Sequence, residues 1–289
     1  MNKIGIVLEG GAMRGMFTAG VLDVLMENKI TFDGAIGVSA GAVFGCNLKS
    51  GQIGRAIRYN LHFSGDWRYC SMKSLLKTGD IFGKDFCYRE LPFALDIFDT
   101  DAIRKNPMEY YVVATDVETG KGGYRRITTG EGADMLWLRA SASMPLVSRP
   151  VRIRDRYFLD GGIADPIPLR SFEMLGYPKN VVVLTQPDTY RKQKVKNLPV
   201  IKAALRRYPA FIERIEDRHL RYNAQTEYVR RREAEGAVFA IRPDYPLGIG
   251  STERDPRELL RVYLHGREVM RRELPGLLSF IIESKAENA

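Results

Sequence analysis

The sequence begins with two short apolar runs, each followed by a glycine-rich turn and then by a segment with helical or close-packed character. Ile4–Leu8 leads through EGGAMRG into residues 13–28, where apolar side chains recur every three or four positions. Asp33–Val38 leads through GVSAG into the small, apolar residues 39–49. Short continuous apolar runs are typical of strands buried on both faces, and the strand–turn–helix repeat is typical of βαβ units. We therefore predict an α/β fold with a mainly parallel central sheet flanked by helices.

The rest of the chain carries weaker signals of the same kind. We predict strands at 110–115, 181–184 and 237–242, a hairpin from 149–154 and 156–160, and helices within 131–143, 208–229 and 256–274. Composition changes after about residue 188, which suggests one domain over 1–190 and a helical C-terminal region over 191–289. That region is either a separate subdomain or further cover for the same sheet.

Basic residues are concentrated in one stretch. The net charge is +9, and residues 191–232 hold 13 Lys or Arg against four Asp or Glu, so this segment alone supplies 13 − 4 = +9. Such a segment favours contact with an anionic surface such as a membrane, although a solvated helix face has the same composition. It contains no recognised nucleic-acid-reading motif, so we expect no nucleic-acid partner.

Cysteine and histidine usage points away from disulfides and metals. The three cysteines, Cys46, Cys70 and Cys87, are odd in number and lack metal-ligand spacing. The N-terminal apolar run is too short for a signal peptide, and no stretch is long enough to span a membrane. We expect a cytoplasmic protein without metal or cofactor.

The turn GVSAG, residues 37–41, has the G-x-S-x-G pattern between a predicted strand and a predicted helix. In that setting the serine projects from a sharp turn as a nucleophile, and the helix N-terminus stabilises negative charge nearby. The glycines Gly37 and Gly41 let the turn close. Ser39 could equally be the N-cap of the helix.

A nucleophilic serine needs a base, and two residue types are available. The histidines are His62, His219 and His265, none of which follows a predicted strand. Asp160 does: FLDGG ends a strand on this aspartate and continues with Gly161 and Gly162. A carboxylate within about 2.6–3.2 Å of the hydroxyl can act as general base. A hairpin or an Asx turn would explain the same residues.

Three interpretations fit the glycine-rich turn at Gly10–Gly15: a tight turn, a phosphate cradle or a set of N–H groups aimed at another target. The spacing is not G-x-G-x-x-G and no G-K-[ST] follows, which weakens the phosphate reading.

Taken in order, GGAMRG at 10–15, GVSAG at 37–41 and DGG at 160–162 resemble the patatin-like phospholipase family, and LEGGAMRG leading into FTAGVLDVL resembles its bacterial branch. The resemblance covers about residues 4–190. It implies a three-layer fold and a Ser–Asp dyad of Ser39 and Asp160 without histidine. It also implies an oxyanion hole built from the N–H groups of Gly10, Gly11 and Ala12.

The family pattern has a third glycine where this chain has Ala12, which we expect to keep ordinary backbone angles. Arg14 and Gly15 would support the loop, or Arg14 would meet an anionic headgroup. We expect Glu9 to point away from the oxyanion or to pair with Arg14.

The resulting prediction is a serine acyl hydrolase acting on lipid esters, similar to a phospholipase A or lysophospholipase. The alternatives are a conventional Ser-His-Asp esterase using His219 or His265, a phosphate- or nucleotide-binding module built on GGAMRG, and a scaffold that has lost catalysis.

Overall fold

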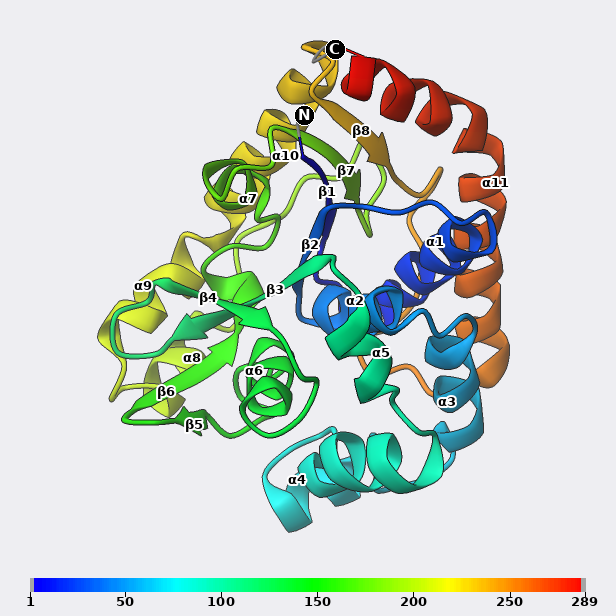
Figure 1. The fold of residues 1–289 in the computed structure, drawn as a ribbon. Helices are drawn as coiled ribbons and strands as arrows, with labels where there is room; N and C mark the ends of the chain where they lie inside the picture. Colours follow the sequence, from blue (N-terminus) through cyan, green and yellow to red (C-terminus); the bar gives the residue numbers. More distant parts are fainter. Residues whose placement is uncertain (1–2, 287–289) are drawn as a thin grey trace.

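A computed structural model describes residues 3–286. Its centre is a mixed sheet in the order β5-β6-β3-β2-β1-β7-β8, with β4 paired to β3 (Figure 1). The block β3-β2-β1-β7-β8 is parallel, and β4, β5 and β6 are antiparallel to their neighbours. The strands are β1 Ile4–Leu8, β2 Gly34–Val38, β3 Glu109–Asp116, β4 Gly122–Ile127, β5 Val151–Ile153, β6 Arg156–Asp160, β7 Lys179–Val183 and β8 Val238–Ile241.

Helices cover both faces of the sheet, which gives three layers (Figure 1). On one face, apolar side chains of α1, α2 and α11 pack on strand residues such as Ile6 and Leu8. On the other face, α7 and α10 pack on the alternate residues, such as Val7. Since both faces are covered, β1 and β2 are apolar at every position and fully buried. The prediction of a three-layer α/β fold is confirmed.

The helices have the following bounds: α1 Gly15–Glu27, α2 Ala40–Ser50, α3 Arg55–Phe63, α4 Met72–Thr78, α5 Thr100–Lys105, α6 Ala133–Ser141, α7 Leu169–Met174, α8 Leu198–Ala204, α9 Pro209–Glu216, α10 Arg218–Ala234 and α11 Pro256–Ala286. Short 3₁₀ turns lie at Ala12–Arg14 and Gly161–Ile163, and a π-helix lies at Phe86–Leu95.

The chain beyond residue 190 shares the core of the chain before it. Strand β8 pairs with β7, and α11 runs along α1 (Figure 1). The two helices approach closely through glycines: a Cβ on Gly20 would lie 2.1 Å from Tyr263 O, and one on Gly266 would lie 2.1 Å from Phe17 O. The boundary near residue 190 stays a prediction, and residues on both sides of it belong to one sheet.

Strands β2 and β6 meet end to end along one edge of β3, and this determines where the site forms. Val38, the last residue of β2, pairs with Val113, and Asp160, the last residue of β6, pairs with the next residue, Ala114. The two strands run in opposite directions, and β4 occupies the other edge of β3. Both strands therefore finish at the same point, and the residue after β2 faces the last residue of β6.

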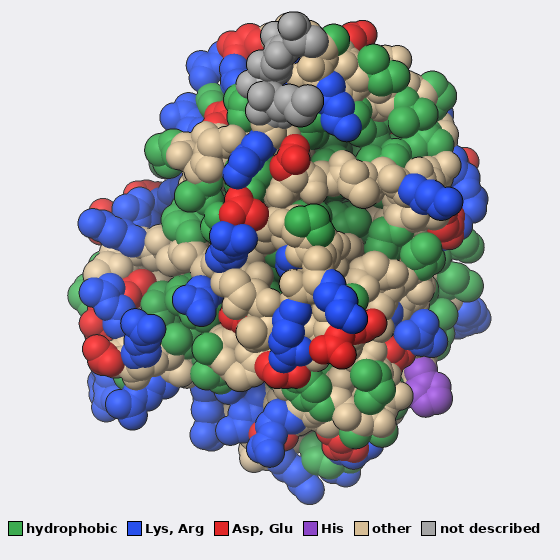
Figure 2. All heavy atoms as spheres, in the orientation of Figure 1, with side chains coloured by type: hydrophobic (Ala, Val, Ile, Leu, Met, Phe, Trp, Pro, Cys, Tyr) green, Lys and Arg blue, Asp and Glu red, His purple; other side chains and the backbone are tan. Residues whose placement is uncertain are grey.

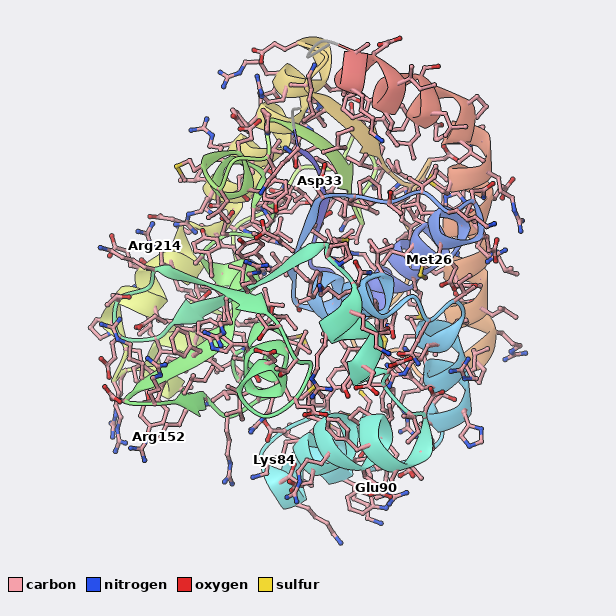
Figure 3. The ribbon with its side chains drawn as sticks, viewed as in Figure 1. Met26, Asp33, Lys84, Glu90, Arg152 and Arg214 are labelled. Carbon is pink, nitrogen blue, oxygen red and sulfur yellow. The ribbon has the colours of Figure 1, made fainter. Side chains whose placement is uncertain are left out.

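Several predicted elements differ in detail. The expected helical face over 208–229 is two helices, α9 and α10, which meet at Asp217. Helix α11 continues through Pro275, well past the predicted end. The loop before β2 is fixed by Asp33, labelled in Figure 3, whose carboxylate accepts a hydrogen bond from Ile4 N at 2.7 Å. No helix within residues 3–286 combines the length and apolar character needed to cross a membrane.

Candidate active site

Ser39 lies on a strained turn between β2 and α2, with φ 55° and ψ −124°. The turn closes because its glycines have no side chains: a Cβ on Gly37 would lie 2.6 Å from Gly41 O, and one on Gly41 would lie 2.4 Å from Leu8 O. Ser39 N donates to Ser141 Oγ at 2.8 Å. Although Ser39 occupies the N-cap position, its hydroxyl makes no capping bond among the residues the structure describes. The strain therefore points the hydroxyl away from the helix.

Asp160 accepts a hydrogen bond from the Ser39 hydroxyl, with 2.6 Å between Oγ and Oδ2. Its other oxygen, Oδ1, accepts from Gly162 N at 2.8 Å, and Asp160 N donates to the Ser143 carbonyl at 2.8 Å. The Asx-turn interpretation and the contact with Ser39 are thus both realised by one carboxylate. The turn bond orients Asp160 toward the serine.

Both members of this pair are buried, and burial governs the acidity of the aspartate. Burial raises the pKa of the Asp160 carboxyl above its usual value; the Ser39 hydrogen bond, the charge of Arg218 and the Gly162 N–H oppose this rise. A carboxylate with a raised pKa is a stronger base than an ordinary aspartate.

The loop Gly10–Ala12 packs directly on Ser39. A Cβ on Gly10 would lie 3.0 Å from Ser39 Cβ, and one on Gly11 would lie 2.7 Å from Thr185 Oγ1. Within residues 3–286, no hydrogen bond runs from the N–H groups of residues 10–12 to another group of the chain. Gly15 brings the following helix onto α2, because a Cβ there would lie 2.8 Å from Ala40 Cβ.

Ala12 has a φ of 49°, so the expectation of ordinary backbone angles at this position is wrong. The chain holds an alanine in the left-handed region that glycine occupies at little cost. The 3₁₀ turn Ala12–Arg14 begins at this residue.

Glu9 is buried and is held by residues that follow β7 rather than by Arg14. Its oxygens accept from Thr185 N at 2.6 Å and from the Tyr222 hydroxyl at 2.8 Å. Burial raises the pKa of Glu9, and the Arg14 charge, acting from farther away, lowers it. Within the described chain no ion pair joins Glu9 and Arg14, and the Arg14 Nε is buried without a hydrogen-bond partner.

Two pockets meet at Ser39, and Ala12, Ser39 and Met144 line both. The first is apolar; its walls come largely from α2, α6 and the segment around the π-helix, including Phe44, Leu91 and Leu138. Lys84 and Glu90, labelled at the lower end of Figure 3, mark that segment. The second pocket, of about 250 Å³, is polar and is lined by Glu9, Arg14, Asp160, Lys192, Arg218 and Tyr222, among others.

No histidine within residues 3–286 lines either pocket. His62 is exposed, and His219 Nδ1 lies 3.0 Å from Glu216 O. His265 is buried between Phe17 and Tyr245. A Ser-His-Asp triad would need a histidine near Ser39, and none of the three histidines lies there.

Sequence reasoning missed the residues that the chain after β7 brings to the site: Thr185, Lys192, Arg218 and Tyr222. Lys192 and Arg218 belong to the basic segment, which was treated as one surface. Much of that segment is ion-paired, as in Lys202–Glu216 and Arg230–Asp188. Figure 2 shows Lys and Arg spread over this face, with a group at its left edge, where Figure 1 places α8 and α9. No group of three metal-ligating side chains occurs among residues 3–286.

An α/β sheet with a serine on a strand–turn–helix, hydrogen-bonded to a buried carboxylate, is an arrangement found among serine acyl hydrolases. Comparison with known proteins is more specific. The family model for patatin-like phospholipases matches residues 6–173, and a domain of unknown function, DUF6363, matches residues 208–282. The chain therefore belongs to the patatin-like phospholipase family. Membership supports an activity on lipid esters.

Curated relatives agree with this placement. The chain is 26% identical over 262 residues to the uncharacterized protein YjjU of Escherichia coli, covering 85% of this chain and 70% of YjjU. It is 29% identical over 171 residues to the uncharacterized NTE family protein Rv1063c of Mycobacterium tuberculosis, covering 58% of this chain and 44% of Rv1063c. Lysophospholipase nte1 of Aspergillus oryzae is 25% identical over 180 residues, covering 61% of this chain and 11% of nte1.

Among solved structures, VipD from Legionella pneumophila has a similar fold, with a TM-score of 0.50 and 13% identity. The match covers 96% of this chain and 67% of VipD.

Proposed function

We propose that the protein hydrolyses carboxylic esters of lipids, in the manner of a phospholipase A or lysophospholipase, through an acyl-enzyme on Ser39. The observation that carries the proposal is the 2.6 Å contact between Ser39 Oγ and Asp160 Oδ2, formed where the apolar and polar pockets meet. The family assignment and the name of the fungal lysophospholipase support the same reaction class.

In the first half-reaction, Asp160 takes the hydroxyl proton as Ser39 Oγ attacks the ester carbonyl carbon. The oxyanion then accepts hydrogen bonds from the N–H groups of Gly10, Gly11 and Ala12, which have no partner within the described chain. One donor of this kind is worth on the order of 3 kcal/mol in the transition state. Collapse breaks the ester bond, and the proton on Asp160 passes to the leaving alkoxide oxygen.

In the second half-reaction, water attacks the acyl-enzyme and gives its proton to Asp160. Collapse of this intermediate releases the carboxylic acid, and the proton returns to Ser39 Oγ. The apolar pocket would hold the acyl chain during both steps, because apolar side chains line it from the serine inward.

Two alternatives receive less support. A conventional triad lacks a histidine in the described pockets around Ser39. A module that only binds phosphate or nucleotide through GGAMRG would not explain the hydrogen bond between Ser39 and Asp160.

The test is hydrolysis of a panel of phospholipid, lysophospholipid and short-chain esters by four proteins. Ser39→Ala and Asp160→Asn should each lower kcat/KM by at least about 10³-fold, since nucleophile and base act as a unit. Ser50→Ala is the matched control, because Ser50 is also buried and ends the helix that Ser39 precedes. Wild-type hydrolysis by either site variant would exclude the dyad.

We also propose that the basic segment touches anionic membranes from the cytoplasm. Lys194, Lys196, Arg206 and Arg207 are exposed and make no ion pair within residues 3–286, and Val200 beside them is 63% exposed. Replacing these four cations by glutamine should abolish co-sedimentation with anionic vesicles at low salt. Unchanged co-sedimentation would refute the contact.

A further inference from the structure

We propose that the polar pocket beside Ser39 binds a net-anionic phosphate headgroup, so that the preferred substrate is an acyl ester carrying a phosphomonoester. The inference rests on the proposed hydrolase function. It assigns to Arg14, Lys192 and Arg218 the recognition of the part of the substrate that lies opposite the acyl chain.

The three cations line one pocket and lack carboxylate partners. None of them forms an ion pair within the described chain, and all three are half-buried. The Arg14 Nε is buried and unpartnered. Burial, followed by the charges of Arg218 and Arg14, lowers the pKa of the Lys192 ammonium to about 8. The charge of Glu9 opposes this lowering, but from beyond ion-pair distance. Partly buried cations without a direct ion pair are costly unless an anion completes the site.

The two carboxylates in the same pocket are already engaged. Glu9 accepts from Thr185 N and the Tyr222 hydroxyl, and Asp160 accepts from Ser39 and Gly162. A choline or ethanolamine group would therefore meet three cations against two carboxylates whose oxygens already accept hydrogen bonds, in a pocket of net positive charge. This charge arrangement favours a headgroup with net negative charge over a zwitterionic one.

Two of the three cations are held in place by specific contacts. Arg218 Nε donates to Gly162 O at 2.7 Å, next to the aspartate. The backbone of Lys192 is clamped by Asn223, which accepts from Lys192 N at 2.8 Å and donates to Lys192 O at 3.1 Å. The Lys192 ammonium lies 5.2 Å from the centroid of the Tyr222 ring. The pocket is thus pre-formed.

Two of the three cations come from outside the matched phospholipase region, which ends at residue 173. Lys192 follows β7, and Arg218 begins α10, inside the region matched by the domain of unknown function. One role of that C-terminal region would accordingly be headgroup selection.

The test compares three soluble substrates with the same octanoyl chain: 1-octanoylglycerol 3-phosphate, 1-octanoylglycerophosphocholine and 1-octanoylglycerol. Wild type should prefer the phosphomonoester by about 10- to 100-fold in kcat/KM, the size expected for one or two charge-assisted contacts. Lys192→Gln should reduce the preference over octanoylglycerol by about tenfold, and Lys192→Arg should retain most of it. Lys202→Gln, in the same basic segment but outside the pocket, should leave the preference unchanged.

Equal kcat/KM for the three substrates, or a Lys192→Gln preference equal to wild type, would overturn the inference while leaving the hydrolase function standing. Failure to hydrolyse any of them, together with no labelling of Ser39 by a fluorophosphonate, would instead remove the hydrolase function. Thermal shift separates the sources of phosphate: glycerol 3-phosphate should stabilise wild type more than Lys192→Gln. Stabilisation by inorganic phosphate without substrate preference would mean a free-phosphate site and would also overturn the inference.

Discussion

Gly161→Ala perturbs the site without changing any group that takes part in the chemistry. An ideal Cβ at this position lies 2.1 Å from Val113 O and 2.7 Å from Val113 C, both backbone atoms of β3. To reach an ordinary carbon–oxygen contact, the two backbones must separate by about 1 Å. Asp160 is the preceding residue, so much of this shift is transmitted to its contact with Ser39.

Overpacking of this kind costs about 1–3 kcal/mol of unfolding free energy. A misplacement of about 1 Å in a catalytic pair can cost on the order of 100-fold in rate. The assay is urea unfolding together with the second-order rate of fluorophosphonate labelling. Gly65→Ala is the control, because an ideal Cβ on Gly65 has nothing within 4 Å. If Gly161→Ala matches Gly65→Ala in both stability and labelling rate, the reasoning is refuted.

Three further predictions concern the loop, the base and the acyl pocket. Ala12→Gly should raise the free energy of unfolding, measured with urea, by about 0.5–1 kcal/mol. Glycine relieves the backbone strain at φ 49°, and this gain exceeds the entropy that glycine adds to the unfolded chain. A lower free energy of unfolding would contradict the strain. Arg218→Gln removes a positive charge that lowers the pKa of Asp160, so that pKa should rise. In the pH profile of the rate of Ser39 labelling by an uncharged fluorophosphonate, the fall in rate at acid pH should then occur at higher pH. A shift of this fall to lower pH would contradict the role of the Arg218 charge. Val43→Phe narrows the apolar pocket and should lower the ratio of long-chain to acetyl ester hydrolysis; an unchanged ratio would count against this pocket as the acyl site.

The elements nearest the site could be predicted from the sequence alone. Strand β1, strand β2 and the hairpin ending at Asp160 lie within a few residues of their predicted bounds. These segments are short, apolar and punctuated by glycine, and local pattern determines them. The pairing of β2 and β6 with the same edge of β3 is non-local, so the sequence alone could not show that Ser39 and Asp160 meet.

Other features depended on tertiary context. The π-helix Phe86–Leu95 has no regular apolar period and was not predicted, although it forms part of the apolar wall. Lys192 and Arg218 were counted as members of a basic surface, because charge alone does not reveal which side chains turn inward. The positive φ of Ala12 contradicts residue preference, so residue type alone could not predict it.

The most direct test of the central claim is fluorophosphonate labelling followed by peptide mapping of wild type, Ser39→Ala and Asp160→Asn. The account predicts a single labelled peptide containing Ser39 in wild type, no label in Ser39→Ala, and labelling slowed by at least about 10³-fold in Asp160→Asn. Label on a different residue, or labelling of Asp160→Asn at the wild-type rate, would contradict it.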